Sequence, residues 1–154
     1  MQLNQKFNTA LIAFVLLTGG LLSPLFAQAK TKLAEGEDKT LTTKDNWPIV
    51  VTYYESSLGK ESPVVILLHM RGSNRLVWKG GFAKRLQAAG YAVVAVDLRK
   101  HGESKPAGAA KVAGKKGTRL KGIDYKLMVA MDLEAVKKFI LSEHHKKKLN
   151  IRKT

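Results

Sequence analysis

The chain contains no cysteine among its 154 residues, so no disulfide can stabilise it. Acidic residues are also scarce, because 12 Asp and Glu stand against 27 Lys and Arg, which gives a formal net charge of +15. The lysines neither share one predicted helix face nor alternate with aromatic side chains, as a dedicated nucleic-acid groove would require. We therefore expect a generally basic protein without a specific nucleic-acid partner, stabilised by packing alone.

No apolar run reaches, without interruption, the roughly 20 residues that a membrane-spanning helix needs. The amino terminus instead carries one basic residue, an apolar stretch over 10–17 and the small-residue triplet Ala27-Gln28-Ala29. This order is typical of a secretory signal peptide over residues 1–29, cleaved after Ala29. The sequence therefore predicts a secreted or periplasmic protein, with a membrane anchor over residues 7–26 as the alternative.

The sequence also gives no indication of a metal site or a cofactor. His144 and His145 are adjacent, so their side chains would diverge on a helix, and no cysteine or carboxylate completes a ligand set with them. We interpret the pair as a solvated helix end. We expect no metal and no cofactor.

The remaining chain predicts a short polar segment followed by one domain over residues 39–154. We interpret residues 30–38 as a flexible linker because they are polar. Four extended segments follow. The first two are predicted to form a hairpin, and the last two are predicted to be strands buried on both faces of a sheet. They cover residues 39–43, 48–54, 64–68 and 91–96.

Two stretches with helical spacing accompany these strands, at residues 74–89 and 124–145. Gly90 would end the first helix, whereas Gly80 and Gly81 weaken its beginning. Strand, helix and strand between residues 64 and 96 make a parallel unit. The pattern as a whole predicts an α/β fold: a mixed sheet of about four strands with two main helices.

A polar loop follows each of the two most apolar strands. The first loop is His69-Met70-Arg71-Gly72-Ser73, and the second is Asp97-Leu98-Arg99-Lys100-His101-Gly102-Glu103-Ser104. Together with their strands, these loops resemble the amino-terminal half of the α/β-hydrolase superfamily, in its esterase, lysophospholipase and dienelactone-hydrolase-like branch. The chain departs from that pattern where Met70 and Lys100 stand in place of common glycines.

The resemblance implies a role for each loop. His69, Met70, Arg71 and Gly72 would form the oxyanion-hole loop, in which a backbone N–H near Met70 or Arg71 faces the anionic oxygen of a tetrahedral intermediate. The resemblance also implies that Asp97, Arg99, His101 and Gly102 form a structural turn, so that neither Asp97 nor His101 is catalytic.

The nucleophile of this superfamily sits on a Gly-x-Ser-x-Gly elbow, and no such pentapeptide occurs in the chain. Gly102-Glu103-Ser104-Lys105-Pro106 comes nearest but lacks the second glycine. The resemblance thus implies a partial fold without the nucleophile-elbow strand and everything after it. We expect a secreted, truncated, α/β-hydrolase-like protein that is inactive alone, although its family hydrolyses ester or amide bonds. Two alternatives stay open: a non-catalytic exported binding protein that uses its basic surface, and a gene fragment.

Two further expectations concern partners and mobility. If the family role is retained, the partner would be a small-molecule ester or amide substrate. The implied strand order leaves residues 64–68 at a bare sheet edge, which favours self-association. Residues 105–121 are low in complexity, rich in Gly, Ala and Lys, and predict a mobile basic loop.

Overall fold

A computed structural model describes residues 33–107 and 119–153 of the chain. The predicted signal peptide and most of the basic segment 105–121 lie outside the described residues. Within the described ranges, no helix combines the length and the apolar composition needed to cross a membrane.

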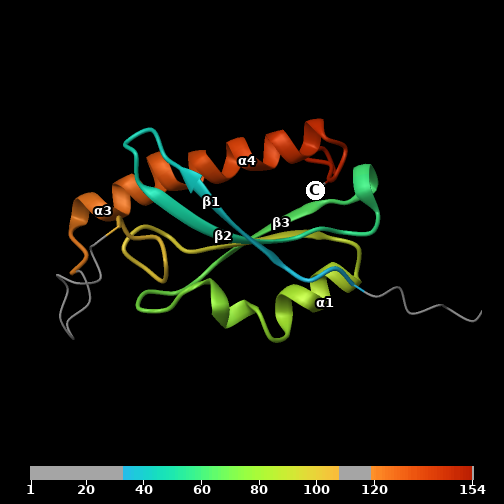
Figure 1. Ribbon diagram of the computed structural model, residues 1–154, viewed down its shortest axis with the longest axis horizontal. Helices are drawn as coiled ribbons and strands as arrows, with labels where there is room; N and C mark the ends of the chain where they lie inside the picture. Colours follow the sequence, from blue (N-terminus) through green and yellow to red (C-terminus); the bar gives the residue numbers. More distant parts are fainter. Residues whose placement is uncertain (1–32, 108–118, 154) are drawn as a thin grey trace, which may run out of the picture. The chain divides into compact units, whose positions relative to one another are not determined.

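The centre of the domain is a mixed, four-stranded sheet, as the sequence predicted (Figure 1). Its strands are β1 (Glu37–Thr42), β2 (Pro48–Tyr54), β3 (Val64–Leu68) and β4 (Ala92–Val96). They lie in the order β1-β2-β4-β3. β1 pairs antiparallel with β2, β2 pairs antiparallel with β4, and β3 pairs parallel with β4. β3 therefore has a neighbour on one side only within the described part of the chain.

The amino-terminal hairpin begins earlier than the sequence indicated. Glu37 and Asp38, which we had assigned to the linker, belong to β1 and pair with Tyr53 and Thr52 of β2. Thr52 Oγ1 donates a hydrogen bond to Asp38 Oδ1 at 2.5 Å, which fixes this end of the strand. The expected linker is thus at least two residues shorter than predicted.

The first predicted helix is interrupted. A 3-10 turn, η2 (Arg75–Trp78), is followed by the α-helix α1 (Phe82–Ala88). The Asn74 side chain caps the start of η2 by accepting a hydrogen bond of 3.0 Å from the Leu76 N–H. Gly80 and Gly81 lie between the two pieces. Two consecutive glycines disfavour a helix because glycine loses the most conformational freedom on folding. A second 3-10 turn, η1 (Gly59–Glu61), precedes β3.

The second predicted helix is continuous but irregular. It begins at α3 (Gly122–Leu127), passes through one π-helical turn, η3 (Met128–Asp132), and continues as α4 (Leu133–His145). A π turn holds one extra residue, so the residues on either side of it are rotated about the helix axis relative to a regular α-helix. The sequence predicted the extent of this helix to within two residues, but not the π turn.

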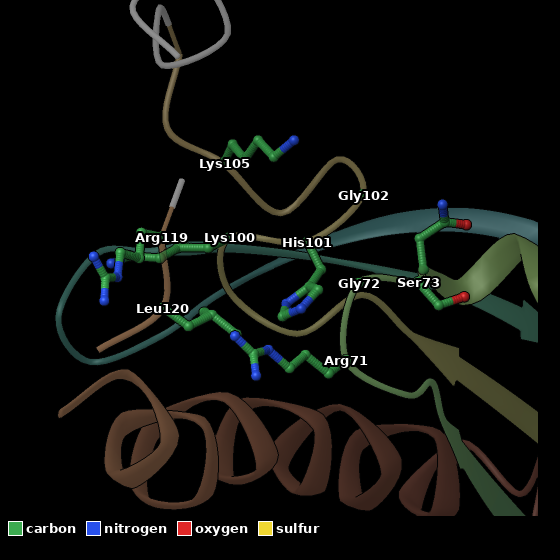
Figure 2. Close-up of a pocket in the computed structure, with 10 residues that line it drawn as sticks. Arg71, Gly72, Ser73, Lys100, His101, Gly102, Lys105, Arg119 and Leu120 are labelled. Carbon is green, nitrogen blue, oxygen red and sulfur yellow. The ribbon is translucent and has the colours of Figure 1, made fainter. Parts of the chain in front are cut away.

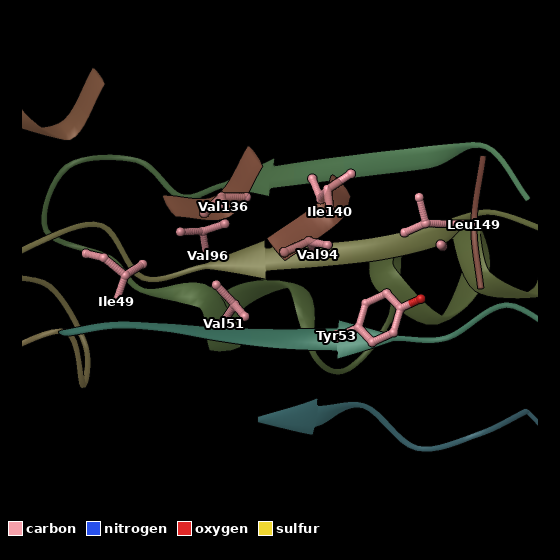
Figure 3. Packing of buried hydrophobic residues seen from close by; sticks show 9 residues of the cluster. Ile49, Val51, Tyr53, Val94, Val96, Val136, Ile140 and Leu149 are labelled. Carbon is pink, nitrogen blue, oxygen red and sulfur yellow. The ribbon is translucent and has the colours of Figure 1, made fainter. Parts of the chain in front are cut away.

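The helices cover both faces of the sheet, with α4 on one face and α1 on the other (Figure 1). Alternate residues of β4 point to opposite faces, so this strand is buried on both sides. Val94 and Val96 pack with Val136 and Ile140 on the α4 face (Figure 3). On the opposite face, Val93, Ala95 and Leu67 pack against Ala83. The continuous apolar runs predicted two strands buried on both faces. The prediction holds for β4 but is wrong for β3, whose Ile66 and Leu68 are exposed because β3 lies at the edge of the sheet.

Candidate functional site

The loops after β3 and β4 meet at one edge of the sheet because the two strands run parallel. The second loop turns sharply: the His101 amide donates to the Leu98 carbonyl, and the Ser104 amide donates to the His101 carbonyl, at 3.0 and 2.9 Å. Lys100 has a φ of 67°, a left-handed conformation that favours glycine. The α/β-hydrolase pattern has glycine at this position, and the φ of Lys100 supplies the physical reason.

A buried ion pair joins the two loops. The Asp97 carboxylate follows β4 and is fully buried, as is almost all of the Arg75 side chain. Arg75 donates to it twice, through its backbone N–H and through Nη1, both at 2.6 Å. The Glu103 amide donates a third bond at 2.9 Å. Asp97 is therefore held by three hydrogen bonds, and the segment after β3 is fixed to the turn after β4.

Arg75 also reaches the amino-terminal hairpin. Its Nη2 pairs with Asp38 at 2.9 Å and with Glu103 at 2.6 Å, and its Nε donates to Thr52 Oγ1 at 3.0 Å. Burial alone would lower the pKa of the guanidinium, but its bonds to Asp38, Glu103 and Asp97 raise that pKa above the ordinary value. Arg75 is thus permanently charged and connects three segments of the chain.

A second buried arginine fixes the other side of the turn. Arg99 donates to Asp132 through its backbone N–H at 2.9 Å and through Nε at 2.8 Å. Its Nη1 pairs with Asp45 at 2.9 Å, and its guanidinium lies 5.4 Å from the centre of the Trp47 ring. Burial raises the pKa of the Asp132 carboxyl even though Arg99 acts in the opposite direction. The turn after β4 is therefore attached to η3, the π turn between α3 and α4.

Lys100 makes a third link, to the start of α3. Its Nζ lies 2.8 Å from Asp124 Oδ2, and the same oxygen accepts the Lys121 N–H at 2.6 Å. The hydrogen bond from Lys100 is the main reason why the pKa of the Asp124 carboxyl is lowered. This contact places the first turn of α3 beside the second loop.

Neither loop offers a nucleophile with its base. Ser104 is fully buried, and its Oγ donates to the Asp97 carbonyl at 2.6 Å and accepts the Val50 N–H at 2.8 Å. His69 Nε2 accepts the Leu98 N–H at 3.3 Å, so Nδ1 carries the proton that bonds the Met70 carbonyl at 2.9 Å. His101 Nδ1 lies 3.0 Å from the Arg99 carbonyl, and the His69 and His101 rings are 4.7 Å apart. Among the described residues, neither histidine bonds to a hydroxyl group.

The two loops enclose a pocket of about 570 Å³ at the carboxyl ends of β3 and β4 (Figure 2). Segment 119–120, just before α3, completes its wall. Its lining residues are Arg71, Gly72, Ser73, Asn74, Lys100, His101, Gly102, Lys105, Arg119 and Leu120. The pocket therefore brings residues of both predicted loops together.

The first loop exposes backbone donors at this pocket. The Ser73 amide donates to the Met70 carbonyl at 3.1 Å and closes a turn. The amides of Arg71 and Gly72 have no acceptor in the part of the chain that the structure describes, and both residues are exposed. Because Gly72 has a φ of 78°, the loop needs its glycine at this place rather than at Met70. The assignment of His69 to Gly72 as an oxyanion-hole loop stays a prediction.

Sequence reasoning missed three residues that build the site: Arg75, Asp124 and Asp132. Arg75 and Asp124 lie near the starts of predicted helices, where charged residues are usually solvated. Asp132 carried a usable signal, because it falls four residues after Met128 and within the apolar stripe of the long helix. A carboxylate on a buried helix face needs a buried partner, which here is Arg99.

No protein-family model and no curated protein sequence matches this chain. Several solved structures do. The esterase EaEST from Exiguobacterium antarcticum is 23% identical, with a TM-score of 0.48 over 68% of this chain and 32% of that one. The Pyrococcus furiosus esterase Pf2001 is 24% identical, with a TM-score of 0.48 over 74% of this chain and 38% of that one. An α/β hydrolase from Novosphingobium aromaticivorans is 25% identical, with a TM-score of 0.45 over 68% and 31%.

The chain thus spans about a third of the length of these proteins. These three proteins are two esterases and an α/β hydrolase. Over part of its length, the chain is similar in structure to a portion of the α/β-hydrolase fold.

Proposed function

We propose that this chain is an α/β-hydrolase-like protein whose described residues supply the oxyanion-loop side of a site for ester or amide substrates. One observation carries the proposal: Arg71 and Gly72 are exposed, their amides have no acceptor among the described residues, and both residues line a pocket at the carboxyl end of parallel strands. Such amides can stabilise the oxyanion of a tetrahedral intermediate, a contribution of roughly 3–4 kcal/mol for each donor.

The same geometry argues against hydrolysis by the described residues alone. Ser104 Oγ donates one hydrogen bond, accepts another and is closed to solvent. Of the four histidines in the chain, His101 is the one that lines the pocket, and its Nδ1 bonds a backbone carbonyl. A nucleophile activated by a histidine is therefore missing from this side of the site.

The loop assignment can be tested with a neutral ester. Phenyl acetate, titrated into the isotopically labelled full chain, should shift the amide resonances of Arg71 and Gly72 in NMR spectra. Arg71→Pro removes one donor and should abolish the local response, whereas Arg152→Pro, an exposed position at the carboxyl-terminal turn, should retain it. The same shift of the Gly72 amide in both variants, or no shift in the unchanged chain at ester saturation, would contradict the proposed role.

The absence of turnover needs a separate assay. Full chain incubated with nitrophenyl esters of short and long acids should release no nitrophenol above background. His101→Gln and Ser104→Ala serve as the comparison. Turnover that survives purification and disappears in either variant would show that the described residues do hydrolyse esters.

The proposal includes export. Residues 1–29 would act as the signal peptide, and the mature chain would begin at Lys30. Mass spectrometry of the protein recovered from the periplasm or medium of an expressing bacterium tests this. A protein that stays in the membrane fraction with an intact amino terminus would favour the anchor over residues 7–26 instead.

A further inference from the structure

The charged residues that line the pocket are all basic. Four basic residues line it, Arg71, Lys100, Lys105 and Arg119, and no acidic residue does. Lys100 is compensated by Asp124 at 2.8 Å. The other three form no ion pair with any residue that the structure describes. Within the described residues, the wall of the pocket therefore carries three uncompensated positive charges.

These cations converge from three separate segments. Arg71 comes from the loop after β3, Lys100 and Lys105 from the segment after β4, and Arg119 from the residues before α3. Figure 2 shows the Arg71 side chain passing below His101 toward Leu120. Arg71 and Gly72 also line this wall, and their amides, which have no acceptor among the described residues, are neutral donors.

The size and lining of the pocket restrict the ligand. A volume of about 570 Å³ lies within the usual range for small-molecule sites. Leu120 is the one lining residue with a large apolar side chain, so little of the wall suits an apolar ligand. Arginine guanidinium groups, which can donate two parallel hydrogen bonds, and backbone amides are well suited to bind phosphate and carboxylate groups.

We propose that this pocket binds a small, multiply charged oxyanion, such as a phosphate monoester or a polycarboxylate, between Arg71 and Arg119. This site needs no nucleophile and does not depend on the hydrolytic role proposed above. If both proposals hold, the anionic group of the bound molecule lies next to the Arg71 amide, and the ester substrate itself carries a negative charge.

Inorganic phosphate and citrate are suitable probes, with glycerol as a neutral comparison. Each is titrated into the full chain at constant ionic strength, and binding is followed by NMR and by calorimetry. We expect saturable binding of both anions, with the largest shifts at the amides of residues 71–74 and 100–105. The double variant R71Q/R119Q should bind about tenfold more weakly, because it removes two of the three uncompensated charges.

The matched control is R85Q/R152Q, which lowers the net charge equally at two exposed positions that do not line the pocket. It should bind within about twofold of the unchanged chain. An equal loss in both double variants would overturn the proposal, since the anions would then respond to net charge alone. So would unsaturable binding, or shifts spread over the surface. Circular dichroism spectra of both variants establish that they are folded.

Discussion

Replacing Arg75 with methionine would leave the Asp97 carboxylate as an uncompensated charge in the interior. The exposed fractions of the two side chains are 2% and 0%. Removing one partner of such a pair typically lowers the free energy of unfolding by about 3–5 kcal/mol. The contacts of Arg75 with Asp38 and Glu103 add little, about 0–1 kcal/mol each, because those carboxylates are 55% and 68% exposed. We expect a total loss of about 3–5 kcal/mol.

Urea denaturation of R75M, followed by far-ultraviolet circular dichroism, measures this loss. Arg152→Met is the control, because this exposed arginine should change stability by no more than about 0.5 kcal/mol. The double variant R75M/D97N is the decisive comparison. The neutral side-chain amide that D97N introduces has a single oxygen, so it can keep one of the two backbone N–H bonds that the carboxylate accepts on separate oxygens. Because D97N also removes the uncompensated charge, the double variant should recover about 1–3 kcal/mol relative to the sum of the single losses.

Two results would refute this reasoning. One is a loss in R75M below about 1 kcal/mol, since it would mean that the buried carboxylate needs no counter-charge. The other is strict additivity of the two substitutions. If R75M is too unstable to fold in buffer, a folded R75M/D97N variant still supports the need for a counter-charge at Asp97. If R75M/D97N is unfolded while D97N alone is folded, the reasoning is contradicted.

Gly102→Ala should destabilise the chain by at least about 2 kcal/mol more than Gly72→Ala. Both glycines have a positive φ, which costs about 1–2 kcal/mol for a residue with a side chain. An added Cβ would lie 2.0 Å from Asp97 Oδ2 at Gly102, whereas at Gly72 it would meet no atom within 4 Å. Equal urea midpoints for the two variants would show that the loop moves aside. Ile66→Lys should abolish the concentration-dependent association that we expect of the exposed β3 edge, and Thr40→Lys on β1 should not. Sedimentation of the unchanged chain as a folded monomer at tens of micromolar would contradict that association.

The strands could be predicted from the sequence because their signal is local. Residues 64–68 and 92–96 are continuous apolar runs, which located both strands, although only β4 is buried on both faces. The break of the first helix was also visible in Gly80 and Gly81. The π turn at Met128–Asp132 was not visible, since it has no local signal of this kind; it ends at Asp132, whose carboxylate bonds Arg99 from a distant segment.

The candidate site was predictable only in part. Both loops carry turn residues in an ordered pattern, which placed them at one sheet edge. The ion pairs that hold them join residues 22 and 33 positions apart, Arg75 with Asp97 and Arg99 with Asp132. Neither pairing has a local signature, since a charged residue near a helix start is solvated more often than buried. The basic pocket depends on those pairings, because they bring three segments to one place.

The two edges of the sheet differ in a way that limits any assembly. β1 carries Glu37, Asp38 and Lys39 in its first half, and charged side chains discourage another strand from pairing with it. β3 carries none, and its Ile66 and Leu68 are exposed. Pairing of β3 with β3 of a second copy uses the same surface on both chains, so it closes after one step. Among the described strands, the outer edges of the joined sheet would be the two β1 strands, so we expect association through β3 to end at a dimer rather than to continue into fibres.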